Sequence, residues 1–214
     1  MFIEQLSTDP QYFFAVCITV VLSICLHELA HGIVAIWLGD RTPIETGHMT
    51  LNPAVHMGGM SLILLLVAGI AWGMMPITPS RLRGRYARTL VALAGPASNV
   101  LMAAIALTIL GVWQRIGINE PPPTGAMRSI RYLLGVFGLI NIALAIFNLI
   151  PIPPLDGSNV LAGLNPGIAD AMAKLRRSGQ SMIIFLLIFA FAGKYITPLS
   201  TQIALGFLRR IRGY

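Results

Sequence analysis

Residues 27–31 read His27-Glu28-Leu29-Ala30-His31, and they lie inside an apolar run that extends from about residue 12 to residue 38. Four residues of α-helix turn through about 400°, so both imidazoles project from one face, one turn apart. That spacing lets two imidazole nitrogens take two corners of a tetrahedral zinc site. Glu28 lies about 100° round the helix from His27, where it can reach a water at the metal without being a ligand. The stretch predicts a metal site on a membrane-embedded helix.

The surrounding apolar run makes this motif stronger evidence for a metal site. In a soluble protein the same five-residue pattern often occurs by chance on a solvated helix face. In the middle of a bilayer each ionisable group costs roughly 2.5–3.5 kcal/mol on the insertion scale, so such groups are retained for a function. The alternative interpretation is an internal polar cluster that satisfies its own hydrogen bonds.

The composition indicates a membrane protein. Of the 214 residues, 56% are hydrophobic and 11% are charged, whereas soluble domains average about 25% charged residues. The mean hydropathy is +0.76. The net charge of +7 comes from basic residues that cluster between the apolar runs, which is typical of a bilayer-spanning chain and argues against a nucleic-acid partner.

The apolar runs predict an all-α polytopic membrane protein with a small membrane-associated β-hairpin or a re-entrant segment after the first helix. We expect one transmembrane domain over residues 1–214, with a core at about 12–165 and a C-terminal membrane segment at about 181–208. The C-terminal segment contains Lys194 and Pro198, so it is either one helix with an interfacial tail or a hairpin of two short helices. The runs fall at about 12–38, 58–75, 89–113, 132–150 and 181–208.

A catalytic zinc usually has three protein ligands, so a third ligand must lie elsewhere in the chain. Asp156 is a candidate because prolines at 151, 153 and 154 unwind the chain after an apolar helix. Unwound backbone at membrane depth is tolerated only where it lines a cavity or is buried in protein. The alternative role for Asp156 is to cap the next helix. The remaining histidines are His48 and His56.

Three patterns together resemble the site-2-protease-type intramembrane zinc metalloproteases, in a minimal form without PDZ or CBS domains. The resemblance covers about residues 20–160. It is carried by His27-Glu-Leu-Ala-His31, Ala94-Gly-Pro-Ala-Ser-Asn99 and Asn148-Leu-Ile-Pro-Ile-Pro-Pro-Leu-Asp156-Gly157. Residues 51–56 and 72–79 also resemble segments of this family.

The resemblance implies that His27, His31 and Asp156 bind one Zn2+ per chain and that Glu28 is the catalytic acid/base. It implies that Asn148 holds the substrate backbone or its developing oxyanion. Asn99 has two open interpretations, the same substrate role or a structural hydrogen bond between helices. His56 is interpreted as a structural residue that supports the site.

The resemblance further implies a protease that cleaves within or near transmembrane segments of membrane-anchored regulators or remnant signal peptides. The main alternative function is a membrane metal-binding protein or metal transporter. Residues 72–79 could present an extended edge that captures an unwound substrate by strand addition. Oligomeric state is not predicted.

A shared metal site demands that the helices at 12–38 and 132–150 run in the same direction, with 89–113 crossing between them. If 181–208 is a hairpin and the N-terminus is outside, basic residues number eleven inside and four outside. The positive-inside rule favours this orientation, with the active site towards the cytoplasm. We expect the membrane to be a prokaryotic cytoplasmic (inner) membrane. If 181–208 is a single span, the counts become eight and seven and decide almost nothing.

Overall fold

The computed structural model describes residues 1–117 and 124–213, without the side chain of Met182. In these residues the chain forms helices and no β-strand. Four helices contain segments long and apolar enough to cross a membrane, which confirms the all-α membrane class. These helices are α2 (Pro10–Trp37), α5 (Ala87–Ile116), α6 (Gly125–Asn148) and α9 (Gln180–Arg212), whose apolar segment is Ile183–Arg212.

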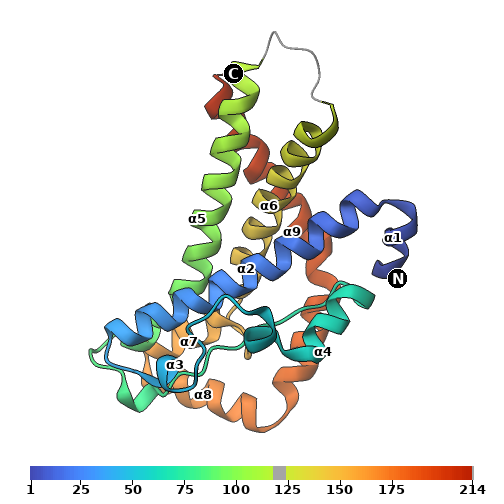
Figure 1. The fold of residues 1–214 in the computed structure, drawn as a ribbon. Coiled ribbons are helices and arrows are strands. Elements are labelled where there is room, and N and C mark those ends of the chain that lie inside the picture. The colour runs from blue at the N-terminus through green and yellow to red at the C-terminus, as the bar shows by residue number, and fades with distance from the viewer. Residues whose placement is uncertain (118–123, 214) are drawn as a thin grey trace.

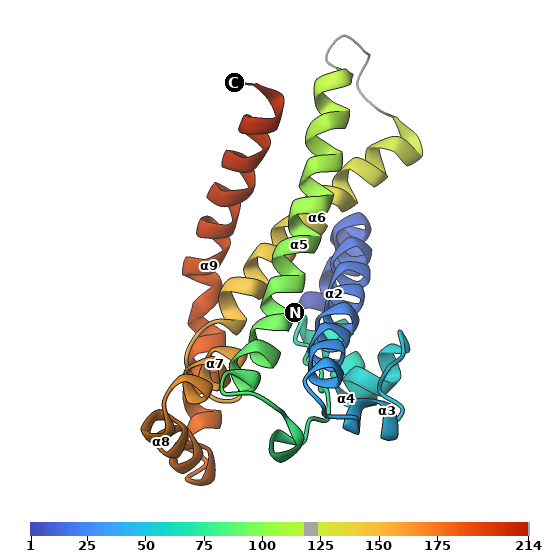
Figure 2. The same cartoon turned by 90° about the vertical axis from the view of Figure 1, so that its left-hand side faces the viewer.

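The long helices alternate in direction. Helices α2 and α6 both run downwards in Figure 1, and α5 and α9 run upwards. This confirms the predicted common direction of the two helices that end near His31 and Asp156. Figure 2 shows α9, α5 and α6 beside one another, with α2 on the far side of α5 from α9.

Close helix packing holds this bundle together. Gly138 of α6 lies against Leu107 of α5, where a Cβ atom would come within 2.6 Å of the leucine side chain. Small residues allow such close backbone approach between membrane helices. A buried apolar cluster from α5, α6 and α9 surrounds this contact and comprises Ala103, Leu107, Leu110, Ile142, Ala204 and Leu208.

Several short helices gather at the lower end of the bundle, whereas α1 (Gln5–Thr8) lies at the opposite end of α2 (Figure 1). Asp9 caps the start of α2 by accepting a hydrogen bond from the Tyr12 N–H at 3.0 Å. Beyond the lower end of α2 come α3 and η2, and α7 and α8 follow the end of α6 (Figure 1). The shorter elements are η1 (Phe2–Glu4), α1 (Gln5–Thr8), α3 (Thr42–Glu45), α4 (Pro53–Ala68), η2 (Pro79–Arg81), α7 (Asp156–Leu164) and α8 (Pro166–Arg177).

The β-hairpin expected after the first helix is wrong. Its place is taken by α4, which is kinked at Gly58 and is 16 residues long, and by the extended segment 70–78. Residues 53–68, which would have supplied the first strand of the hairpin, form α4. Among the described residues, the extended segment therefore has no second strand to pair with. Its backbone bonds instead to Ser61 of α4, to the His56 carbonyl and to Asp40.

The hairpin alternative for residues 181–208 is also wrong. Helix α9 continues unbroken from Gln180 to Arg212, with Gly193 and Pro198 inside it. Nothing in that stretch supplies a turn, because Gly193 stays helical. The single-span alternative therefore applies, and the charge counts of eight and seven no longer favour either orientation.

Candidate metal centre

Three ligand-type side chains converge from two elements that lie far apart in the sequence. His27 and His31 project from α2, and Asp156 begins α7. The two Nε2 atoms are 3.0 Å apart. The Asp156 Oδ2 atom lies 3.1 Å from His27 Nε2 and 3.3 Å from His31 Nε2. The close group predicted from the sequence is thus present.

The hydrogen bonds of the two imidazoles show which ring nitrogens carry protons. His27 Nδ1 lies 2.6 Å from Asn99 Oδ1, and His31 Nδ1 lies 2.6 Å from the Val91 carbonyl. Both partners only accept, so each Nδ1 is the donor. A neutral histidine then has a bare Nε2. Two nitrogen lone pairs and a carboxylate oxygen therefore face one another.

Such an arrangement fits a bound cation. Zn–N bonds of about 2.0–2.1 Å in a tetrahedron place neighbouring ligand atoms about 3.3 Å apart, close to the separations seen here. Asp156 Oδ2 is buried and accepts no hydrogen bond from the described residues. Gly95 of α5 is buried against the two imidazoles, and a Cβ atom added there would lie 2.4 Å from each Nε2, so the absence of a side chain keeps this space free.

A chain of buried amides holds His27 in place. Asn99 of α5 accepts from His27 and donates its Nδ2–H to Asn141 Oδ1 of α6 at 2.8 Å. Asn141 in turn donates to Ser23 Oγ of α2 and to the Phe137 carbonyl. Asn99, Asn141 and Ser23 are fully buried. The chain of bonds closes a ring through α2, α5 and α6, which fixes the imidazole relative to the other helices.

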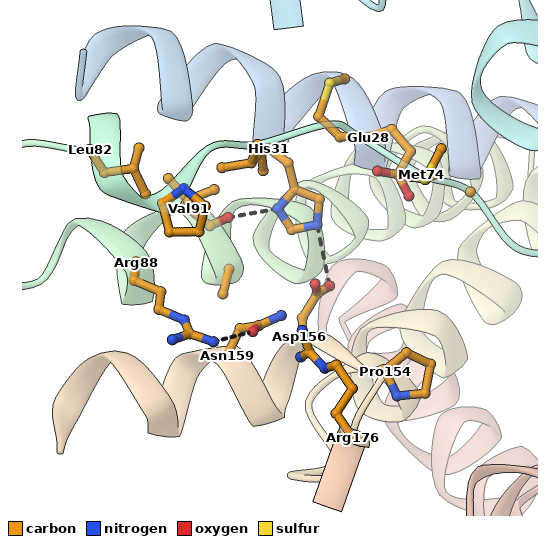
Figure 3. A pocket seen from close by; sticks show the side chains of 15 residues that line it. Glu28, His31, Met74, Leu82, Arg88, Val91, Pro154, Asp156, Asn159 and Arg176 are labelled. Carbon is orange, nitrogen blue, oxygen red and sulfur yellow. Dashed lines mark hydrogen bonds and ion pairs between the residues drawn. The ribbon is translucent and has the colours of Figure 1, made fainter. Parts of the chain in front are cut away.

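Glu28 lines a cavity of about 540 Å³ together with His31 and Asp156. In Figure 3 its carboxylate lies across this cavity from Asp156, beside Met74 of the extended segment. The Gly73 backbone passes so close that a Cβ atom there would come 2.6 Å from Glu28 Oε1. The extended segment therefore forms the wall beside the carboxylate.

The other predicted site residues lie outside the group of three. His56 is buried and bonds through Nε2 to the Thr50 carbonyl at 2.6 Å, which is consistent with a structural role. Asn148 ends α6, and its Nδ2–H donates to the Leu144 carbonyl at 3.0 Å. His48 bonds within its own loop, to Thr46.

Sequence reasoning missed Asn141 and Gly95. Asn141 is a polar residue in an apolar helix, so the criterion that drew attention to Asn99 would have found it. Gly95 belongs to the quoted Ala94–Asn99 motif, but only a structure shows that its missing side chain faces both histidines.

Comparisons with known proteins agree with this chemistry. The sequence model described as "Peptidase family M50" matches residues 112–191. The chain is 34% identical over 190 residues to "Putative zinc metalloprotease YwhC" of Bacillus subtilis, covering 87% of this chain and 82% of the relative. It is 29% identical to "Putative zinc metalloprotease Rip2" of Mycolicibacterium smegmatis, covering 78% of this chain and 64% of the relative. No solved structure matches the chain.

Proposed function

The chain belongs to peptidase family M50, the site-2 protease family, and is an intramembrane zinc metalloprotease; from this premise we propose that His27, His31 and Asp156 hold one zinc ion and that Glu28 is the catalytic acid/base. The convergence of two bare Nε2 lone pairs and one unpaired carboxylate oxygen at 3.0–3.3 Å carries the proposal. A divalent cation bound between these three atoms would offset their mutual repulsion without a proton on either Nε2.

Each residue then has a task in peptide hydrolysis. Zinc bound there supplies Lewis acidity for the scissile carbonyl and lowers the pKa of water at the site. Glu28 takes the proton from the attacking water and later returns it to the leaving amine. Asn99 positions His27 through the bond to Nδ1, so we assign it a structural role and not a substrate contact. Asn148 stays our candidate for substrate contact, and it would first have to release the Leu144 carbonyl.

Substrate capture by the extended segment is supported by its hydrogen-bond alternation. The N–H groups of Trp72, Met74 and Thr78 are used by Ser61, the His56 carbonyl and Asp40. Within the described residues, the intervening N–H groups of Gly73, Met75 and Ile77 have no acceptor. These three residues line the cavity that contains Glu28. An unwound substrate could add to this edge as a strand.

We propose further that α4 dips into the bilayer without crossing it, because its 16 residues are fewer than the roughly 20 needed to span. The substrates proposed are transmembrane segments of membrane-anchored regulators or remnant signal peptides, as the resemblance implies. We keep the inner-membrane location and the cytoplasmic active site as proposals that rest on the family resemblance. Labelling of single cysteines placed in α3 and in α8, on a background without Cys17 and Cys25, tests the orientation.

The assignment of Glu28 is tested with the variant Glu28→Gln in purified protein. We expect zinc content to stay at one per chain by elemental analysis and peptide cleavage to fall about 10²–10⁴-fold, because only the proton carrier is lost. Glu45→Gln is the matched control, since Glu45 is exposed on α3 and pairs with Arg81 at 2.6 Å. Cleavage by Glu28→Gln at the wild-type rate would refute the role of Glu28.

The metal ligands are tested separately by Asp156→Asn, which should lower zinc content. In cells that carry Glu28→Gln, uncleaved membrane fragments should accumulate, and proteomics of the membrane fraction would identify them as substrates.

A further inference from the structure

Two arginines line the same cavity as the proposed catalytic residues. Arg88 is the second residue of α5 and is half-buried, and Arg176 lies exposed in the last turn of α8. Figure 3 shows both guanidinium groups on the side of the cavity away from Glu28, below His31. Arg88 Nη2 donates to Asn159 Oδ1 of α7 at 2.9 Å.

The fold holds Arg88 in this place. Helix α7 packs directly on the start of α5, where Thr89 Oγ1 donates to the Val160 carbonyl at 3.1 Å. A Cβ atom added to Gly163 would lie 2.3 Å from Thr89 Oγ1, so the two helices meet as closely as their backbones allow. Asn159 is therefore fixed beside Arg88. It occupies one of the five N–H donors of the guanidinium, and the others stay available to a ligand.

The charge of this pair is not neutralised by the protein. Over residues 1–117 and 124–213, neither arginine forms an ion pair with a carboxylate, and the two repel each other. Glu28 and Asp156 share the cavity, but their two negative charges are matched by the divalent ion proposed above. The remaining field at this wall is positive, and it stabilises an anion.

We propose that Arg88 and Arg176, with Asn159 as a positioning residue, form a subsite for a carboxylate of the substrate. This inference rests on the catalytic site proposed above. The carboxylate is an acidic side chain near the scissile bond or the free C-terminus of a short peptide. A planar guanidinium fork matches a carboxylate in two parallel hydrogen bonds. The occupant is the substrate because the arginines face the cavity that exposes Glu28 and His31, where the scissile peptide must lie.

The experiment uses the purified zinc-loaded protein in nanodiscs of uncharged phosphatidylcholine. The probes are synthetic transmembrane peptides in which each position in turn is Asp or Asn, together with one sequence made as the C-terminal acid and as the C-terminal amide. Cleavage is followed by mass spectrometry for the wild type, Arg88→Gln and Arg176→Gln. Arg177→Gln is the matched control, because Arg177 neighbours Arg176 in α8 but does not line the cavity.

We expect the wild type to cleave Asp peptides faster than Asn peptides at one or two positions. This preference, measured as the ratio of kcat/KM, should fall about tenfold in Arg88→Gln. In Arg176→Gln, where the guanidinium is exposed, it should fall about two- to fivefold. Arg177→Gln should keep both the preference and the wild-type rate on neutral peptides. A preference confined to the acid–amide pair would assign the subsite to the free C-terminus.

Two results would overturn the subsite: an Asp–Asn ratio that is the same in the wild type and Arg88→Gln, or an effect that follows added anionic lipid and not peptide charge. The same peptides, fluorescently labelled, are also titrated against the Glu28→Gln protein by anisotropy. If Glu28→Gln cleaves these peptides as fast as the wild type, the proposed catalytic site fails. The anisotropy titration tests the subsite independently of cleavage. Tighter binding of Asp peptides than of Asn peptides supports the subsite, and equal binding refutes it.

Discussion

Replacing Gly95 with alanine should remove the metal while leaving the bundle folded. The added Cβ atom would lie 2.4 Å from both Nε2 atoms and 2.5 Å from His27 Cε1, whereas ordinary van der Waals contact begins near 3.4 Å. The two imidazoles must therefore move by about 1 Å, or the methyl group must. A catalytic constellation tolerates only about 0.5 Å. The methyl group also occupies the space in which an ion must contact both nitrogens.

The size of the effect can be bounded from below. Loss of an outer hydrogen-bond partner of a ligand typically costs 10–100-fold in metal affinity. Displacement of two ligands must cost at least the upper figure, about 100-fold, or about 2.7 kcal/mol. The overpacking penalty on the fold is about 1–3 kcal/mol, so some loss of thermal stability should accompany the loss of metal.

The assay is competition for zinc between the purified protein and a chromophoric chelator, with thermal unfolding measured on the same samples. Gly193→Ala is the control, because a Cβ atom there meets nothing within 4 Å and the residue is helical in α9. A Gly95→Ala protein that binds one zinc with wild-type affinity would refute the placement of the metal between the two histidines.

Three further substitutions test other parts of the structure. Asn99→Ala should lower zinc affinity 10–100-fold by releasing the His27 Nδ1–H, whereas Asn148→Ala should leave it unchanged in the same chelator assay. Ile77→Pro removes an N–H from the extended edge and should impair cleavage without changing zinc content. Ile77→Val is the control, and unchanged turnover in Ile77→Pro would refute substrate capture by strand addition. Burial raises the pKa of Asp40, but hydrogen bonds from Thr42 and Thr78 outweigh it, so the net pKa lies below 3.8. The stabilisation by Asp40 is thus present above pH 3.8 and lost as the pH falls through the lowered pKa. Asp40→Asn should reduce thermal stability at neutral pH, by about 1.5–3 kcal/mol, and the two proteins should converge in acid; a constant difference in melting temperature at every pH would contradict this.

The metal group could be predicted because its chemistry is local in the sequence. One helical turn fixes the relation of His27 to His31, and the prolines before Asp156 mark the end of a helix. The requirement that these two places meet then predicts the direction of α6 relative to α2, which the fold confirms. The choice of Asp156 as the third ligand came from the family resemblance, because the prolines alone also allow it a role as a helix cap.

The supporting residues could not be predicted in the same way because they depend on how three helices rotate against one another. The sequence left two roles open for Asn99, and only the contact with His27 at 2.6 Å favours one of them. The β-hairpin failed for a related reason. Residues 70–78 lie outside any helix or strand. Whether such a segment pairs with a second strand depends on its neighbours, and here Ser61 and the His56 carbonyl of α4 bond to its backbone instead.

Four buried polar residues of this bundle, Ser23, Asn141, Asn99 and His27, form one connected chain of hydrogen bonds, which explains how they are tolerated. A lone asparagine in an apolar helix would leave amide groups unsatisfied at considerable cost. Here Ser23, Asn141 and Asn99 satisfy one another, and the last acceptor is used by the proton of His27. At the end of this chain of bonds, His27 Nε2 faces the proposed metal position. Each of these polar residues would be costly to bury alone. Linked by hydrogen bonds, they orient the His27 imidazole so that its Nε2 faces the proposed metal.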